Sequence, residues 1–122
     1  MKKFKFLFLV ILAGIPFIYS DGQISSRHLD IVFIGNSITQ GDQPGDPAEE
    51  SPPVYTAKYI RTLKGVESVR FLNRGRSGYT TVDFLPTPDG ELSKVISAVK
   101  DFHTDFSRQL VFSISLGTND SA

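Results

Sequence analysis

Cysteine is absent from the sequence, and histidine occurs only twice among its 122 residues. The lack of cysteine excludes a disulfide framework, a thiolate zinc site and a cysteine nucleophile. Two histidines, His28 and His103, are too few for a histidine-rich metal site, so we expect no metal and no other cofactor. Because the sequence has no basic stretch and a formal net charge of zero, we also expect no nucleic-acid partner. The remaining composition, 40% apolar and 21% charged, is that of one globular domain.

Residues 1–22 have the pattern of a signal peptide. Three lysines precede an apolar run at residues 6–15, and Ser20 and Gly22 are small residues at the positions that a signal peptidase reads. The run is shorter than the roughly 20 residues that a transmembrane helix needs. We therefore expect residues 1–22 to be removed, leaving residues 23–122 secreted or periplasmic without a stable membrane anchor. The alternative is an anchor that stays uncleaved.

Residues 23–122 alternate strand patterns with helix patterns. Apolar runs predict strands at residues 30–35, 68–73 and 110–116, and the first and third runs read as strands buried on both faces. Ser51-Pro52 suits a helix start, and apolar residues then recur at helical spacing as far as Gly65. Residues 92–102 show the i, i+3, i+4, i+7 pattern of an amphipathic helix, whereas residues 41–53 read as a loop.

The order strand, helix, strand, helix, strand predicts a parallel sheet with crossover helices. We therefore expect an α/β fold, a flavodoxin-like three-layer α/β/α arrangement. With about three strands and two to three helices it is incomplete. In such sheets, sites form in the loops at the carboxyl ends of the strands. Three loops should converge there, one each after Ile34, Leu72 and Leu116.

These three loops contain the parts of an acyl-transfer site. Ser37 follows the first strand, and a serine in such a cleft becomes nucleophilic when a base removes its proton. The tetrahedral intermediate then needs hydrogen-bond donors aimed at its oxyanion. The backbone N–H groups of Ser37 and Gly78 and the side-chain amide of Asn119 could supply three. The plainer interpretations are a helix cap for Ser37, a turn glycine for Gly78 with Gly75 as its rival, and a cap or turn residue for Asn119.

The three blocks also resemble those of the SGNH, or GDSL-type, hydrolases, which include esterases, lipases and carbohydrate deacetylases. The nucleophile block is residues 34–41, the glycine block is Ser77-Gly78, and the asparagine block is residues 117–120. The resemblance implies that Ser37 is the nucleophile and that Gly78 and Asn119 are oxyanion donors. Asn36 stands where the name-giving motif of the family has aspartate. The similarity extends over residues 30–120.

The base of such a site is missing from the sequence. A serine hydrolase needs a histidine, normally oriented by an acid. His28 precedes the first strand and His103 ends the second helix, so we expect both at the amino edge of the sheet, opposite Ser37. The resemblance implies an Asp-x-x-His block, and none follows Asp120. We therefore interpret residues 23–122 as the N-terminal part of an SGNH-type hydrolase domain, inert or nearly so and marginally stable as given.

The predicted function is a secreted serine ester hydrolase. Residues 41–53 are polar and acidic and offer no apolar surface for an acyl chain, so we expect O-acetyl esters of carbohydrates rather than lipids as substrates. The first alternative is a non-catalytic flavodoxin-like module whose loop after the first strand cradles a phosphate. The second is a secreted interaction domain without a site.

Overall fold

The computed structural model describes residues 27–42 and 45–121, so the expected signal peptide lies outside the described residues. The described elements are, in chain order, β1 (Arg27–Gly35), α1 (Ser37–Gln40), α2 (Pro47–Glu50), α3 (Pro52–Ile60), β2 (Val66–Gly75), a 3₁₀ turn (Val82–Phe84), α4 (Glu91–Phe102) and β3 (Gln109–Ser115). Within the described ranges, no helix has the length and apolar character required to cross a membrane.

The sheet is parallel, and its strand order is β2-β1-β3. β1 lies in the centre because its apolar run can be buried on both faces, and its residues from Asp30 to Gly35 are all buried. Gly35 pairs with Gly75 of β2 and with Ser115 of β3, so the carboxyl ends of the three strands lie level with one another. This register confirms the predicted α/β fold and the convergence of the three loops.

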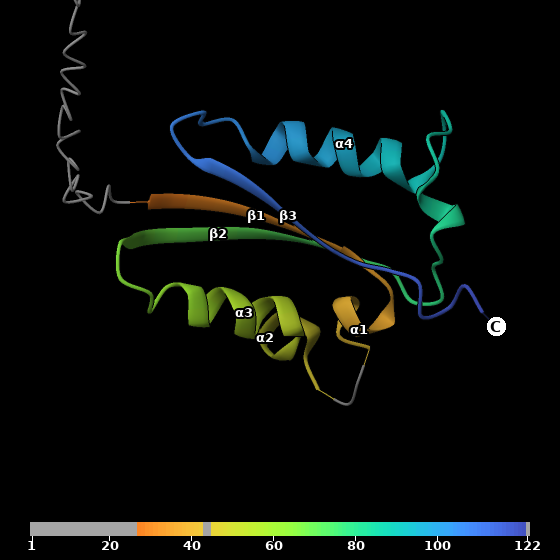
Figure 1. Ribbon diagram of the computed structural model, residues 1–122, viewed down its shortest axis with the longest axis horizontal. Helices are drawn as coiled ribbons and strands as arrows, with labels where there is room; N and C mark the ends of the chain where they lie inside the picture. The colour runs from red at the N-terminus through yellow and green to blue at the C-terminus, as the bar shows by residue number, and fades with distance from the viewer. Residues whose placement is uncertain (1–26, 43–44, 122) are drawn as a thin grey trace, which may run out of the picture.

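Helices cover both faces of the sheet (Figure 1). α1, α2 and α3 lie on one face and α4 lies on the other. Successive residues of β1 point to opposite faces. Ile31 and Phe33 therefore pack with Ala57 of α3, whereas Val32 and Ile34 pack with Val95 of α4. These two clusters form the two halves of a three-layer core.

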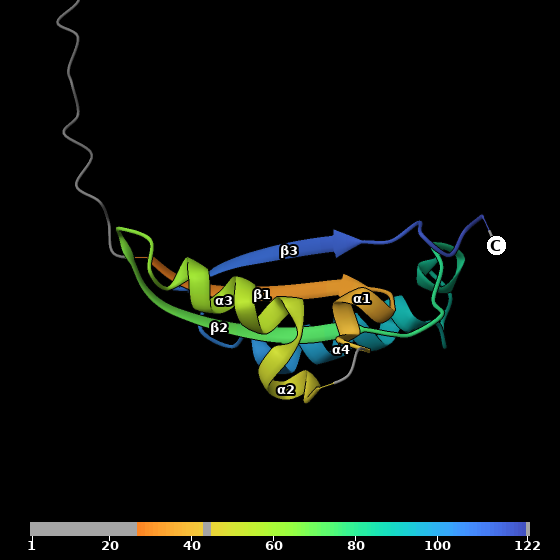
Figure 2. The same ribbon diagram turned by 90° about the horizontal axis from the view of Figure 1, so that it is seen from below.

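β3 differs from the expectation that it is buried on both faces. It lies at the edge of the sheet, and Phe112 and Ile114 are 49% and 66% exposed. Figure 2 shows β3 along one margin of the sheet, away from α3. Its apolar composition matches that of β1, but a strand is buried only where neighbouring elements cover it, and strand order is not a local property of the sequence.

Two helix boundaries also differ from the sequence pattern. α3 ends at Ile60, because Thr62 and Leu63 form i→i+3 backbone hydrogen bonds to Tyr59 and Ile60 that turn the chain away from the helix. Within the loop predicted at residues 41–53 lies the short helix α2. Its start combines Asp46, whose side chain accepts the Ala48 N–H, with Pro47 at the first helical position.

Candidate active site

Ser37 is the first residue of α1, immediately beyond the carboxyl end of the central strand. Asn36 caps this one-turn helix, because its side-chain oxygen accepts the Ile38 N–H at 3.0 Å. Asn36 is only 2% exposed, so its side chain is fixed by packing as well as by the cap. Ser37 itself is partly exposed, and its hydroxyl and backbone N–H take part in no hydrogen bond with the other described residues. Both groups can therefore form hydrogen bonds with a ligand at the carboxyl ends of the strands.

Gly35 permits the tight path from β1 into α1. A Cβ at this position would lie 2.0 Å from Thr39 Oγ1 and 2.8 Å from the backbone oxygen of Ser115. A side chain would push α1 away from the sheet and from β3. Glycine is therefore required here by close packing, and it brings Ser37 next to the strand ends.

The loop after β2 offers the backbone N–H of Gly78. Gly78 has φ +77°, an added Cβ would meet nothing within 4 Å, and its N–H donates to none of the described residues. Gly75, the rival, is engaged differently. Its N–H donates to Asn73 Oδ1 at 2.9 Å, and its Cα packs so closely on α1 that a Cβ would lie 2.2 Å from the Gln40 nitrogen. Among the described residues the Gly78 N–H therefore has no partner, whereas the Gly75 N–H has one.

Asn119 lies in the loop after β3 and contacts the loop after β2. Its side-chain Nδ2 donates to the Tyr79 carbonyl oxygen at 2.9 Å. Asp120 accepts from both the backbone N–H and the hydroxyl of Thr81. A primary amide carries two N–H donors, so the bond to Tyr79 orients the Asn119 side chain and leaves the second donor free for a ligand. The structure thus brings the loops of Gly78 and Asn119 together.

Asn73 is a site residue that the sequence analysis did not single out. Its Nδ2 donates to the carbonyl oxygens of Thr39 at 2.9 Å and Gln40 at 3.5 Å, and its Oδ1 accepts from Gly75. Asn73 therefore anchors the carboxyl end of α1 to the end of β2. An asparagine beside a glycine-bearing loop is a common turn signal, but its contact with α1 depends on the fold.

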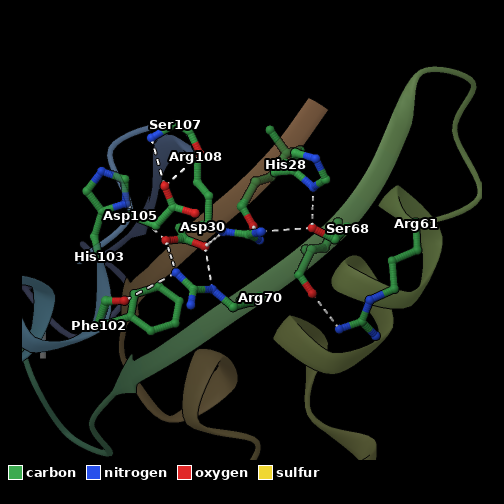
Figure 3. Close-up of polar contacts among 12 residues, drawn as sticks. His28, Asp30, Arg61, Ser68, Arg70, Phe102, His103, Asp105, Ser107 and Arg108 are labelled. Atoms are coloured by element: carbon green, nitrogen blue, oxygen red, sulfur yellow. Dashed lines mark hydrogen bonds and ion pairs between the residues drawn. The ribbon is translucent and has the colours of Figure 1, made fainter. Parts of the chain in front are cut away.

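The two histidines lie at the amino ends of the strands, opposite Ser37, as predicted. His28 is the second residue of β1, which begins before the predicted strand, and its Nδ1 lies 2.8 Å from Ser68 Oγ (Figure 3). His103 Nδ1 lies 2.9 Å from Asp30 Oδ2, near the amino end of β1. The strand from Asp30 to Gly35 separates them from Ser37 by roughly 20 Å, far beyond hydrogen-bond reach. Neither histidine can serve Ser37 as a base.

Asp30 is the centre of a buried ionic cluster at this amino edge. Its fully buried carboxylate accepts hydrogen bonds from Arg70 at 2.8 and 2.6 Å and from Arg108 and His103. Burial by itself would raise the pKa of the Asp30 carboxyl. The hydrogen bonds from Arg70, Arg108 and His103 outweigh burial and hold this pKa well below its usual range. Asp30 therefore stays ionised and links β1, β2 and the segment before β3.

The family model described as GDSL-like Lipase/Acylhydrolase matches residues 31–122. The chain belongs to this GDSL-like family. Comparison with curated proteins and with solved structures finds no match. The membership confirms the resemblance read from the three sequence blocks and supports a general acylhydrolase function. Asn36, which stands where the family motif has aspartate, caps α1 through its side-chain oxygen. An aspartate at this position would offer the same accepting oxygen. The catalytic roles of Ser37, Gly78 and Asn119 stay predictions.

A second buried carboxylate of this GDSL-like chain lies near the carboxyl end of β2. Glu91, the first residue of α4, accepts from Arg74 at 2.6 Å and lies 3.7 Å from Arg76 and 3.8 Å from Lys94. This ion pair fixes the start of α4 beside the loop that carries Gly78. In the described part of the chain, no group of three or more His, Asp or Glu side chains is placed to hold a metal ion.

Proposed function

We propose that this chain provides the nucleophile and the oxyanion donors of a secreted serine ester hydrolase that removes O-acetyl groups from carbohydrates. The observation that carries the proposal is the free Ser37 hydroxyl at the level strand ends where the loops of Gly78 and Asn119 are held together. Secretion is supported by the basic and apolar pattern of residues 1–22.

The proposed reaction is acyl transfer through a covalent intermediate. Ser37 Oγ attacks the ester carbonyl carbon while a base takes its proton, and the carbonyl oxygen becomes an oxyanion. That oxyanion accepts hydrogen bonds from the N–H groups of Ser37 and Gly78 and from the free amide N–H of Asn119. Collapse of the tetrahedral intermediate breaks the bond to the alcohol oxygen, which takes the proton from the base, and leaves an acyl group on Ser37. Water then attacks this ester, and a second collapse releases the carboxylic acid and restores the hydroxyl.

The surface beside α1 supports a sugar as the alcohol part of the ester. A cavity of about 510 Å³ begins at Ile38, the residue after Ser37, and is shared by α1, α2 and the start of α3. Its wall combines apolar surface from Ile38, Pro52 and the exposed ring of Tyr55 with the carboxylates of Asp46 and Glu50. An aromatic face beside hydrogen-bonding carboxylates suits a sugar.

The proposal includes a base from outside the 122 residues. Because His28 and His103 lie at the amino edge, the chain by itself should hydrolyse esters very slowly or not at all. A diffusible base that reaches Ser37 should then restore part of the activity. Imidazole is the matching reagent, since it is the functional group of the absent histidine.

The test is hydrolysis of p-nitrophenyl acetate by the 122-residue chain at increasing imidazole concentration. Imidazole itself cleaves this ester, so the same titration with Ser37→Ala provides the background. We expect an imidazole-dependent increment that the Ser37→Ala variant lacks, and no activity without imidazole. Equal rates for both proteins at all imidazole concentrations would contradict the nucleophile assignment. Steady hydrolysis without imidazole would contradict the external base.

The phosphate-binding alternative has less support from the geometry. The loop after β1 would need several free N–H groups pointing at the anion. The Ile38 N–H is taken by the Asn36 side chain, and those of Gln40 and Gly41 donate to backbone oxygens of Asn36 and Ser37. Titration with inorganic phosphate, followed by nuclear magnetic resonance (NMR), distinguishes the two functions, because the hydrolase proposal expects no saturable shift of these amides.

A further inference from the structure

The loop after β2 forms a β-turn over Arg76–Tyr79, and the conformation of this turn sets the direction of the Gly78 N–H. The Tyr79 N–H donates to the Arg76 carbonyl oxygen at 3.3 Å, with Ser77 and Gly78 as the two central residues. Gly78 has φ +77°, whereas the φ of Ser77, like that of every described residue other than glycine, is not positive. A negative φ at the first central residue and a positive φ at the second is the pattern of a type II turn. Rotation of the Ser77–Gly78 peptide would convert it to type I and turn the Gly78 N–H toward the opposite side.

Ser77 is held at two points by the residues at the end of the nucleophile helix. Gln40 Oε1 accepts the Ser77 backbone N–H at 2.6 Å, and Asp42 Oδ2 accepts the Ser77 hydroxyl at 2.8 Å. Both bonds join segments more than thirty positions apart in the sequence. They fix the residue that immediately precedes Gly78 in the turn.

The same two residues are tied to the nucleophile through their backbones. The Gln40 N–H donates to the Asn36 carbonyl oxygen and the Asp42 N–H donates to the Ser37 carbonyl oxygen, each at 3.0 Å. Gln40 and Asp42 therefore join the turn that carries Ser37 to the turn that carries Gly78. These contacts fix the position of the Ser37 hydroxyl relative to the Gly78 N–H, which donates to the oxyanion in the proposed reaction.

We propose that Gln40 and Asp42 are positioning residues that hold the Ser77–Gly78 peptide with its N–H toward the oxyanion. This inference rests on the proposed function of Ser37 and Gly78. Gln40 and Asp42 act through Ser77 and do not touch the reacting atoms. The Ser77 N–H belongs to the Arg76–Ser77 peptide, so Gln40 acts on the Ser77–Gly78 peptide through the position of Ser77. Loss of the Gln40 acceptor should loosen Ser77 and let the peptide that follows it rotate, which misplaces one oxyanion donor and leaves the ester-binding surface intact.

The test compares Gln40→Met with Gln40→Glu, which retains an accepting oxygen, and with Gln109→Met. The last is a matched control, because Gln109 is exposed at the amino end of β3 and its side chain bonds to no described residue. Two readouts are needed: exchange of the Ser77 amide proton by NMR, and the imidazole-assisted, Ser37-dependent hydrolysis of p-nitrophenyl acetate. Unchanged amide shifts of Val69 and Leu72 in β2 verify that each variant is folded.

We expect Gln40→Met to speed exchange of the Ser77 amide at least about 10-fold and to lower the assisted kcat about 10- to 100-fold, with KM nearly unchanged. Gln40→Glu should restore most of both, and Gln109→Met should alter neither. A fall in Ser77 protection without a fall in kcat would overturn the proposal, because the contact would then be merely structural. Unchanged Ser77 protection in Gln40→Met would overturn it too. If the unmodified chain shows no Ser37-dependent rate, the proposed function fails, and this inference fails with it.

Discussion

Asp30 offers the sharpest test of the forces that hold the sheet together. Asp30→Asn keeps the size of the side chain and removes the charge that Arg70, Arg108 and His103 share. The Asn amide also replaces one accepting oxygen by donors that face Arg70 and either Arg108 or His103. Breaking a buried ion pair by removing one partner typically costs about 3–5 kcal/mol, because the remaining charges are left uncompensated. A domain of about a hundred residues has a free energy of unfolding of roughly 5–15 kcal/mol, so this single change should remove a large share of it.

Urea denaturation followed by circular dichroism measures the effect. With a denaturant dependence of about 1–2 kcal/mol per molar urea, the midpoint should fall by about 1.5–5 M. The matched control is Asp89→Asn, because Asp89 is exposed and forms no ion pair with the described residues, and its effect should stay within about 0.5 kcal/mol. A loss of less than about 1 kcal/mol in Asp30→Asn would refute the reasoning, since the buried carboxylate would then carry little of the stability.

The same cluster predicts the direction of the pH dependence. The pKa of Asp30 is lower in the folded chain than in the unfolded chain, so protonation favours unfolding. The contribution of Asp30 is complete above the ordinary aspartate pKa of about 4 and is lost progressively as the pH falls below that value. The difference in stability between the unmodified chain and Asp30→Asn should therefore shrink as the pH is lowered from about 5 to 2. A difference that is constant over that range would contradict the assignment.

Three further predictions concern the nucleophile turn and its neighbouring loop. Gly35→Ala should destabilise the chain by several kcal/mol in urea, because the new Cβ would overlap Thr39 and the backbone of Ser115. Gly78→Ala meets no atom and should cost only about 1–2 kcal/mol for its positive φ, while the imidazole-assisted rate falls as the turn changes type. Asn36→Ala should cost about 1–2 kcal/mol through loss of the cap, whereas Asn36→Asp should retain most of the stability.

The parts of the fold that were predictable depend on local pattern and on the rules of parallel sheets. The apolar run of β1 predicts a strand buried on both faces. The alternation of strands and helices predicts that the loops of Ser37, Gly78 and Asn119 meet. Both results need only the period of the apolar residues and the direction of the strands. The amino-edge position of His28 and His103 followed from the same argument.

The remaining features depend on which distant segments become neighbours. The edge position of β3 follows from strand order, so an apolar run alone could not predict the exposure of Ile114. The sequence pattern places Asp30 at the start of an apolar strand but does not predict its ion pairs. Nothing near Asp30 in the sequence shows that Arg70 and Arg108 surround its carboxylate. The contacts of Asn73 and Gln40 across the site likewise arise only when α1 packs on the end of β2.

Acetylation of Ser37 tests the central claim most directly. The chain would be incubated with p-nitrophenyl acetate and imidazole, quenched in acid, digested, and sequenced by mass spectrometry. The account predicts one acetyl group on the Ser37 hydroxyl, with none on the equivalent peptide of Ser37→Ala. Acetylation spread over exposed lysines with none on Ser37, at imidazole concentrations that accelerate ester cleavage, would contradict the account.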